Sequence, residues 1–308
     1  MKVLITPRSF GQSDAHAFRI LEQAGLEIVK NDTGKILSEE MLADLIKDCD
    51  GIILGVDPLT AKVLDGAPKL RAIAKYGVGV DNIDLDACKK RNIHVSRTVG
   101  ANANAVADYA FALMLSVSRQ IIPIDKKCRA GAWEKSTSLD VYGKTLGLVG
   151  LGAIGKGVAA RARGFDMRVF AYDPFWDEAY AAEAGIQRAS LDEIYQKADF
   201  ISVHVPLNEE TRGLIGAREL GLMKPTAILI NTARGGVIDE DALIEALQSG
   251  QIYGAGLDVF EKEPPSDTRW FALSNVVLGS HCAASTLGAT EQMSRMAAEN
   301  LVRDLNLT

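Results

Sequence analysis

Short apolar runs alternate with helix-like segments twice along this 308-residue chain, and this alternation limits the fold more than any other feature. In the first hundred residues the strand-like runs are 3–5, 26–29, 51–54 and 70–74. A second series begins at Thr145, with strand-like runs at 146–149, 168–172, 200–203, 227–230 and 254–257. Strands that alternate with helices predict βαβ units and a parallel sheet. We therefore expect an α/β protein with two Rossmann-like, doubly wound domains.

Two further helical segments complete the pattern. The stretch from about 101 to 119 is rich in alanine, contains neither Gly nor Pro, and predicts a long buried helix. A polar stretch at 126–144 separates it from the second series, and a last helix is expected at about 289–305. The sequence shows no internal repeat of solenoid length and no low-complexity segment.

Composition excludes several classes of protein. The chain carries 34 Lys and Arg against 40 Asp and Glu, and this net charge of −6 does not favour binding to nucleic acid or to an anionic membrane. The four cysteines lie far apart without the spacing of metal ligands, so we expect neither a metal site nor a disulfide framework. No stretch approaches the roughly 18 apolar residues of a membrane helix, and the N-terminal apolar run is too short for a signal peptide. We therefore expect a cytoplasmic protein.

A glycine-rich turn opens the second series. Gly150, Gly152 and Gly155 form a GxGxxG pattern that follows a strand-like run directly and leads into a helix-like run. The first glycine permits a tight turn, the second lets the backbone approach a pyrophosphate, and the third packs the helix on the strand. The N-terminus of that helix offers unpaired N–H groups to phosphates. The pattern predicts a dinucleotide site.

The residue that closes the next strand identifies the dinucleotide. Asp173 stands 18 residues after Gly155, where a carboxylate accepts hydrogen bonds from the adenosine ribose and repels a 2′-phosphate. Residues 174–177 contain no cation that could receive such a phosphate. We therefore expect NAD as the cofactor, in preference to NADP.

Charged side chains follow three later strands of the second series. Arg234 lies beyond the strand at 227–230, Asp258 follows the strand at 254–257, and His281 follows an apolar strand at 276–278. Glu263 lies between the last two strands. Because ligands of such sheets bind at the carboxyl ends of the strands, we expect these side chains to line one site.

This set supplies what hydride transfer from a hydroxy acid, or to a keto acid, requires besides the cofactor. A guanidinium such as Arg234 can hold a carboxylate in a bidentate manner, and a histidine can exchange the hydroxyl proton. The chain has four histidines, His16, His94, His204 and His281, and only His281 has carboxylates and an arginine at neighbouring strand ends. His204, just before Pro206, either lines the cofactor cleft or packs in the core.

Several long segments resemble the D-isomer-specific 2-hydroxyacid dehydrogenases, and most closely their phosphoglycerate dehydrogenase-like branch. In the second series these are NTARGGVIDE (231–240), GLDVF (256–260) and the Glu263-Pro264 pair. In the first series they are GVGVDNID (77–84) and ANANAVAD (101–108). The order Arg, Glu, His along the chain agrees as well, and the resemblance covers essentially the whole chain.

The resemblance implies a role for each matching residue. Arg234 would bind the substrate carboxylate and carbonyl, His281 would be the general acid/base, and Glu263 would hydrogen-bond His281 and raise its pKa. Asp258 would hold the nicotinamide carboxamide. The other implied cofactor contacts are Gly150, Gly152, Ala153, Ile154, Gly155, Asp173, Val205, Pro206, Thr232, Ala233, Arg234, His281 and Ala283. The substrate contacts, besides Arg234 and His281, would come from the loop of Tyr76, Gly77, Val78 and Gly79 and from Lys75 before it.

The resemblance also implies how the chain is divided. A discontinuous substrate domain would comprise residues 1–99 and 287–308, and a central NAD-binding domain would comprise residues 100–286. Members of the family are commonly homodimers, formed through the long helix after Ala101. The implied ligands are NAD and a small anionic 2-keto or 2-hydroxy acid.

One departure from the family pattern leaves the substrate open. Phosphoglycerate dehydrogenases usually carry a phosphate-holding arginine where this chain has Gly55, which weakens that assignment relative to a hydroxypyruvate or glyoxylate reductase. Lys75 or Arg8 could supply the missing cation and select a substrate with a second anionic group. Two alternatives of another kind remain, an NAD-sensing corepressor or scaffold on the same fold and a phosphite-oxidising enzyme.

Overall fold

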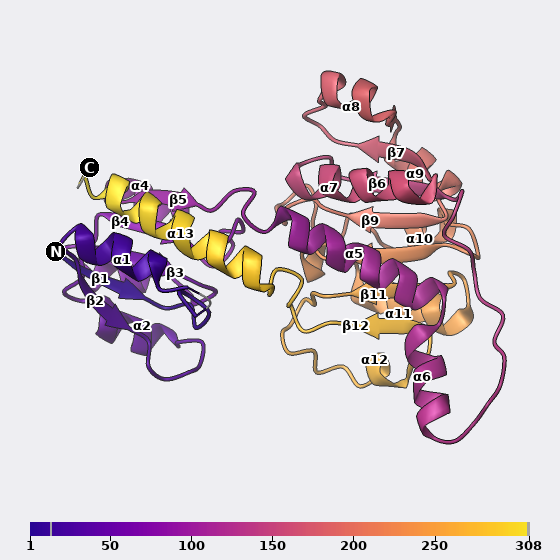
Figure 1. Ribbon diagram of the computed structural model, residues 1–308, viewed down its shortest axis with the longest axis horizontal. Coiled ribbons are helices and arrows are strands. Elements are labelled where there is room, and N and C mark those ends of the chain that lie inside the picture. Colours follow the sequence, from indigo (N-terminus) through magenta and orange to yellow (C-terminus); the bar gives the residue numbers. More distant parts are fainter. Residues whose placement is uncertain (13, 307–308) are drawn as a thin grey trace. The chain divides into compact units, whose positions relative to one another are not determined.

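The computed structural model describes residues 1–12 and 14–306, and the chain divides into two compact units (Figure 1). Unit 1 combines Met1–Asn102 with Ala284–Thr308, and unit 2 is the continuous segment Ala103–Ala283. Both boundaries lie within three residues of those expected from the sequence, 99/100 and 286/287.

Unit 1 contains a five-stranded sheet, all parallel, in the order β2-β1-β3-β4-β5. Its strands are β1 (Lys2–Ile5), β2 (Glu27–Lys30), β3 (Gly51–Leu54), β4 (Ala72–Lys75) and β5 (His94–Arg97). Its helices are α1 (His16–Gln23), α2 (Glu39–Ile46), α3 (Ala61–Asp65), α4 (Leu85–Lys90) and α13 (Leu287–Asp304). The strand order reverses between β1 and β3, which makes their carboxyl ends the topological switch point of this sheet.

Helix α13 comes from the end of the chain but packs against α1, β3, β4 and β5 of unit 1. Its buried face, which includes Ala297, Ala298 and Leu301, shares an apolar cluster with Val3 and Ile5 of β1. A Cβ on Gly51 would lie 2.9 Å from Leu301 Cδ1, so the glycine at the start of β3 lets the helix approach the sheet closely. The first unit therefore has a discontinuous sequence but a continuous core.

Unit 2 contains a seven-stranded parallel sheet in the order β12-β11-β10-β9-β6-β7-β8. Its strands are β6 (Thr145–Val149), β7 (Arg168–Tyr172), β8 (Gln187–Arg188), β9 (Phe200–Val203), β10 (Ile228–Asn231), β11 (Gly254–Leu257) and β12 (Val276–Leu278). Its helices are α5 (Ala103–Ser118), α6 (Ile121–Arg129), α7 (Ala153–Ala162), α8 (Glu178–Ala184), α9 (Leu191–Lys197), α10 (Ala217–Leu222), α11 (Glu240–Ser249) and α12 (Arg269–Ala272), with short 3₁₀ turns at Arg163–Phe165 and Gly235–Val237. The switch point of this sheet lies between β6 and β9.

Helix α5 is the long, apolar helix expected from the sequence, and it packs against β10, β11, β12 and α7. Strand β11 has glycines at two of its four positions because the helix passes directly over it. A Cβ on Gly256 would lie 2.8 Å from Leu113 Cβ, and a Cβ on Gly254 would lie 2.7 Å from Val117 Cγ1. Small residues in this strand therefore set the distance between helix and sheet.

The predicted fold class, two doubly wound α/β domains, is confirmed. Three corrections concern local structure. The polar stretch at 126–144 begins inside α6, a separate helix that starts after the left-handed residue Gln120. The two-residue strand β8 and the four-residue helix α12 were not expected, since segments this short carry no readable periodicity.

No single helix in residues 1–12 and 14–306 is long and apolar enough to cross a membrane. Helices α5 and α6 together reach the required length and composition, but they are bent by 61° at the break between them. Nine residues of α5, among them Phe111 and Met114, are buried inside unit 2.

Candidate active site and cofactor site

The glycine-rich turn lies at the switch point of unit 2. Gly150 follows β6 directly and has φ +103°, a backbone conformation that favours glycine. A Cβ at this position would lie 2.7 Å from the carbonyl oxygen of His204, which follows β9. Gly155, in the first turn of α7, packs so close to Gly150 that its Cβ would lie 2.2 Å from the Gly150 carbonyl oxygen. Both glycines are required for the turn to fit between the two strands.

The start of α7 has the properties of an anion site. Gly152 is the N-cap residue and provides no side-chain cap, and a Cβ on it would meet no atom within 4 Å. The N–H groups of Ala153, Ile154 and Gly155 make no hydrogen bond within the described part of the chain. Free N–H groups at a helix N-terminus beside an open glycine fit the pyrophosphate of a dinucleotide.

Asp173 follows β7 and faces the same turn. Its Oδ2 accepts a hydrogen bond from the Leu151 N–H at 2.7 Å, and its Oδ1 accepts one from the Phe175 N–H at 2.8 Å. These bonds fix the carboxylate on a cavity of about 500 Å³ that is also lined by Gly152, Lys156 and Asp177. A fixed carboxylate in an open cavity at this strand end is suited to hold ribose hydroxyls.

The loop after β10 carries Arg234 and is shaped by its neighbours. Asn231, the last residue of β10, donates from Nδ2 to the Arg234 carbonyl at 2.8 Å and accepts from the Ala233 N–H at 3.0 Å. Gly235 is buried against the following loop, because its Cβ would lie 1.9 Å from the carbonyl carbon of Phe260. The missing side chain therefore lets the Arg234 loop pack on the segment that leads to Glu263.

Glu263 and His281 form a direct pair. The distance between Glu263 Oε2 and His281 Nδ1 is 2.7 Å, and both side chains are partly exposed, at 37% and 42%. Partial burial raises the pKa of the Glu263 carboxyl, but the hydrogen bond and charge of His281, the Phe260 N–H and the charge of Arg234 together hold it below its usual value. Since Glu263 occupies Nδ1, Nε2 of His281 is the ring atom left for a substrate.

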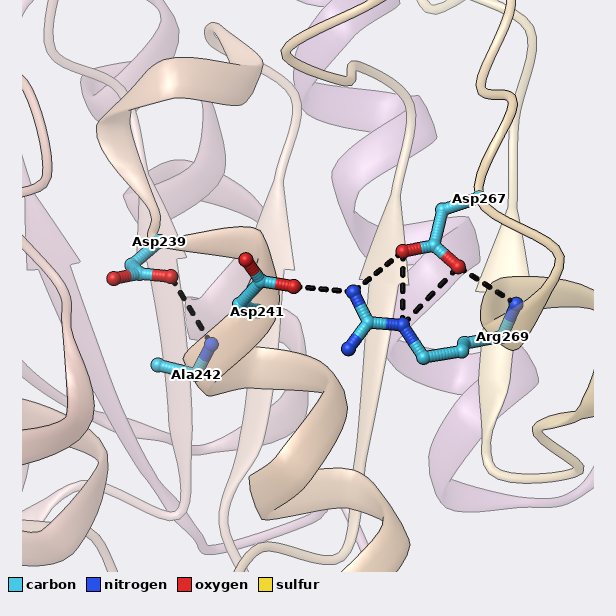
Figure 2. Close-up of polar contacts among 5 residues, drawn as sticks. All are labelled: Asp239, Asp241, Ala242, Asp267 and Arg269. Atoms are coloured by element: carbon cyan, nitrogen blue, oxygen red, sulfur yellow. Dashed lines mark hydrogen bonds and ion pairs between the residues drawn. The ribbon is translucent and has the colours of Figure 1, made fainter.

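Polar contacts on both sides anchor the loop that carries Glu263. Glu240, in the first turn of α11, accepts from the Glu261 N–H at 2.5 Å. Arg269 contacts both Asp241 of α11 and Asp267, and its Nε lies 2.9 Å from Asp267 Oδ2 (Figure 2). Asp239 caps α11 by accepting a hydrogen bond from the Ala242 N–H at 3.0 Å. The loop is therefore attached to α11 at two points.

Asp258 organises the turn after β12. Its carboxylate is buried and accepts hydrogen bonds from the Cys282 N–H at 3.0 Å and the Ala283 N–H at 2.8 Å. Its carbonyl accepts from the His281 N–H at 2.8 Å. His281 has φ +55°, a left-handed conformation uncommon for a residue with a side chain, and it occurs here at a candidate site residue.

Arg234, Glu263 and His281 line one open cavity of about 430 Å³. Arg212 lines it as well, and sequence reasoning missed this residue. It comes from the loop after β9, and its Nη1 lies 3.4 Å from where a Cβ on Gly236 would be. No strand-end signal marks Arg212, since it is the ninth residue after the end of β9. No group of three or more His, Cys, Asp or Glu among residues 1–12 and 14–306 is placed to hold a metal ion.

The remaining cofactor candidates lie around the same strand ends. Val205 and Pro206 follow β9, and Thr232 and Ala233 follow β10. Thr232 Oγ1 is buried without a hydrogen-bond partner in the described part of the chain, as expected of an atom that awaits a ligand. His204 is placed differently, because burial lowers its pKa to about 3 and its Nε2 lies 2.9 Å from Ser202 Oγ. It packs beneath the turn as a neutral side chain.

The predicted substrate loop lies in unit 1, after β4. Gly77 has φ +128°, and its N–H donates to Thr98 Oγ1 at 2.9 Å. Tyr76 Oη donates to the Thr290 carbonyl of α13 at 3.1 Å. In the described part of the chain, the N–H groups of Val78 and Gly79 make no hydrogen bond, so this backbone can offer donors to an anion.

Lys75, one of the expected substrate contacts, lies inside unit 1. Its side chain is buried, and Nζ donates to the Gly55 carbonyl and, at 2.9 Å, to Asn82 Oδ1. A buried ammonium with such partners serves its own domain, where it fixes the loop after β3. Arg8 is exposed and donates from Nη1 to the Gly34 carbonyl at 3.2 Å. Sequence position at a strand end could not show that Lys75 points inward.

Comparison with known proteins agrees with this geometry. Residues 111–283 match the model of the D-isomer specific 2-hydroxyacid dehydrogenase, NAD binding domain. A glyoxylate reductase of Korarchaeum cryptofilum is 43% identical over 292 residues, which cover 92% of this chain and 87% of that protein.

Two solved structures show the same architecture. A D-lactate dehydrogenase from Aquifex aeolicus, complexed with NAD and lactic acid, has a TM-score of 0.83 and 32% identity, and the match covers 96% of this chain and 93% of that chain. An acyclic imino acid reductase, Bsp5, in complex with NADPH and D-Arg, has a TM-score of 0.85 and 30% identity, covering 96% and 94%. Neighbours on this fold thus include complexes with either dinucleotide.

Proposed function

The chain belongs to the D-isomer specific 2-hydroxyacid dehydrogenase family, and from this premise we propose that it reduces a small 2-keto acid such as glyoxylate with NADH, with Arg234, Glu263 and His281 as the binding and proton-transfer residues. The protein is an NAD-dependent oxidoreductase that interconverts 2-hydroxy and 2-keto acids. The observation that carries the assignment of residues is the 2.7 Å contact between Glu263 and His281 in a cavity that Arg234 also lines.

Each side chain of this group has one task. The Arg234 guanidinium binds the substrate carboxylate and polarises the keto oxygen. His281 donates a proton from Nε2 to that oxygen during reduction and takes it back during oxidation. Glu263 accepts from Nδ1, which orients the ring and stabilises its protonated form. Bound NADH supplies the hydride.

Unit 2 would hold the cofactor with residues that fit it. The turn of Gly150, Gly152 and Gly155 and the N–H groups of Ala153 and Ile154 would bind the pyrophosphate, and Asp173 would bind the adenosine ribose. Asp258 would hold the nicotinamide carboxamide. The Thr232 hydroxyl, which has no hydrogen-bond partner among the described residues, would gain one from the cofactor. The remaining proposed contacts are Val205, Pro206, Ala233 and Ala283.

Glyoxylate or hydroxypyruvate suits this chain better than phosphoglycerate. Gly55 provides no cation, and Lys75 donates to the Gly55 carbonyl instead of facing outward. The similarity to a glyoxylate reductase over 92% of the chain supports the same choice. Unit 1 would act as the substrate domain, with the backbone of Tyr76, Gly77, Val78 and Gly79 facing the substrate carboxylate. No observation favours a corepressor or a phosphite-oxidising enzyme.

The protein would act in the cytoplasm as a homodimer without nucleic-acid or membrane partners. Helix α5 itself is largely buried in unit 2, so the exposed apolar residues that follow it are better suited to an interface. Ile121 and Ile122 are 53% and 50% exposed, Trp133 is 93% exposed and Tyr142 is 68% exposed. Light scattering of the wild type and of an Ile121→Ser, Trp133→Ser variant would report the loss of a dimer.

A panel of 2-keto acids with NADH tests the function. Loss of the absorbance of the reduced cofactor should be fastest with glyoxylate or hydroxypyruvate and slower with a substrate that carries a phosphate. Turnover only with the phosphorylated acid would overturn the substrate assignment, and no turnover with any acid would overturn the proposed roles.

A further inference from the structure

A lysine joins two carboxylates in the cavity at the end of β7. Lys156, Asp173 and Asp177 all line this cavity of about 500 Å³, and the inference below rests on the proposed binding of adenosine there. Lys156 is in the first turns of α7, whereas Asp177 is the N-cap residue of α8. The sequence segment after Asp173 contains no cation, but the fold brings one in from another element.

Contacts with α8 fix the position of the lysine. Lys156 Nζ lies 2.5 Å from Asp177 Oδ2 and 4.6 Å from the centre of the Tyr180 ring. The Tyr180 hydroxyl donates in turn to the Lys156 carbonyl at 3.0 Å. The hydrogen bond from Lys156, and then that from the Tyr180 N–H, holds the pKa of the Asp177 carboxyl below its usual value. Asp177 is therefore charged at neutral pH and neutralises Lys156.

This arrangement bears on the choice between the two dinucleotides. NADP differs from NAD by a phosphate on the ribose 2′-oxygen, the group that the carboxylate of Asp173 would face. That phosphate carries close to two negative charges and needs a cation to replace its water shell. Two carboxylates and one ammonium leave the cavity with one net negative charge. A phosphate would thus meet repulsion, although a lysine stands within the same cavity.

We infer that Asp177 helps to select NAD over NADP, because its ion pair with Lys156 prevents that lysine from binding a 2′-phosphate. Selection against NADP then has two parts. Asp173 repels the phosphate directly, and Asp177 removes the one cation of the cavity lining that could compensate for it. Lys156 is 32% exposed and Asp177 is 42% exposed, so both side chains of the pair are partly open to solvent.

The test measures binding of NADH and of NADPH to the full-length protein by titration calorimetry, without substrate or turnover. Asp177→Asn removes the charge but keeps an N-cap residue for α8, because asparagine caps helices as well as aspartate does. We expect the Kd of NADPH to fall about five- to tenfold in this variant, while that of NADH changes less than about twofold. The gain should shrink at high salt, because the new contact is partly exposed.

Two variants separate this proposal from a general effect of charge. Glu178→Gln removes the same charge one residue along, from a side chain that contacts Trp176 Nε1 at 2.9 Å and does not line the cavity. It should leave both affinities unchanged. Adding Lys156→Met to Asp177→Asn should abolish the gain in NADPH affinity.

Each contrary result is distinguishable. An equal gain in Glu178→Gln, a gain that survives Lys156→Met, or unchanged NADPH affinity in Asp177→Asn would overturn the inference while NADH binding still supported the proposed function. Equal affinity of the wild type for both dinucleotides would overturn it too, since Lys156 would then be available already. A wild type that binds neither dinucleotide would overturn the proposed cofactor site and the inference together.

Discussion

The switch points of the two sheets differ in how their polar groups are satisfied. In unit 1, between β1 and β3, the Thr6 hydroxyl donates to Asp57 and accepts from the Gly55 N–H at 2.9 Å, and Asp57 also accepts from the Leu37 N–H at 2.8 Å. In unit 2, between β6 and β9, the first N–H groups of α7 have no partner among the described residues. Doubly wound sheets bind ligands at such points, but only the second is left open.

The difference shows that the sheet provides a position and the side chains decide its use. Thr6, Asp57 and Lys75 are all at most 5% exposed, and their internal hydrogen bonds close the ends of β1 and β3 in the first sheet. Arg234, Glu263 and His281 instead line an open cavity. Substitutions at the closed edge should therefore act on stability, and substitutions at the open edge should act on the reaction.

The largest effect is expected from His281→Ala at the open edge. Removal of the proton donor should lower kcat by about a thousandfold or more while the Kd of NADH stays within about threefold, because NADH is held mainly by other groups. Steady-state kinetics and a binding titration measure both quantities. His16→Ala, at the exposed start of α1, should leave them unchanged. A normal kcat in His281→Ala would remove this residue from its proposed role.

Gly235→Ala tests whether the open edge depends on the close packing of two loops. The new Cβ would lie 1.9 Å from the carbonyl carbon of Phe260, so the backbone must shift and separate Arg234 from Glu263. We expect kcat/KM to fall about a hundredfold. Gly164→Ala is the matched control, since its Cβ meets nothing within 4 Å. Equal activity of the two variants would contradict the packing argument.

Glu263→Gln weakens the pair at the open edge without removing the histidine. The protonated imidazole loses its carboxylate partner, so kcat for reduction should fall about tenfold and its alkaline limb should move to lower pH. In the wild type the pKa of Glu263 lies below its ordinary value of 4.5. The ion pair with His281 therefore persists at pH values above 4.5, and it is lost only when the pH falls further and Glu263 becomes protonated. An unchanged pH–rate profile would mean that Glu263 only orients the ring.

The smallest effect on the reaction is expected at the closed edge. Lys75→Met removes the donor to the Gly55 carbonyl and should lower the free energy of unfolding by about 1–3 kcal/mol. It should not change the ratio of KM values between 2-keto acids with and without a second anionic group. Arg8→Ala, an exposed cation on the same edge, should leave stability unchanged. A selective rise in KM for the dianionic acids in Lys75→Met would restore its role in substrate binding.

Much of the fold follows from local patterns. Strands β7, β9 and β11 begin and end where the sequence predicts. Strands β9 and β11 are buried at every position, and a strand buried in a parallel sheet is a continuous apolar run with clear ends. Ser38 is the N-cap residue of α2, where its Oγ accepts from the Met41 N–H, and such a residue type before a helical run is a local signal. The predicted order of Arg234, Glu263 and His281 on strand ends also brings them to one cavity.

What could not be predicted depends on contacts between distant segments. Lys156 and Asp177 are 21 residues apart on different helices, and nothing in either segment indicates the pair. Lys75 is the last residue of β4, a position where ligand-binding residues often stand. Its side-chain direction is set by the carbonyl of Gly55, which follows the neighbouring strand β3. Arg212 reaches the cavity from a loop whose path no periodicity describes.

The attachment of α13 to the first sheet has a consequence for synthesis on the ribosome. Residues 1–102 emerge early, but the helix that covers Val3 and Ile5 is translated only after all of unit 2. At synthesis rates of about 5–20 residues per second, the apolar face of the first sheet stays without this helix for on the order of ten seconds or longer. We therefore expect unit 2 to complete its fold first, with nascent unit 1 as the segment that chaperones must shield.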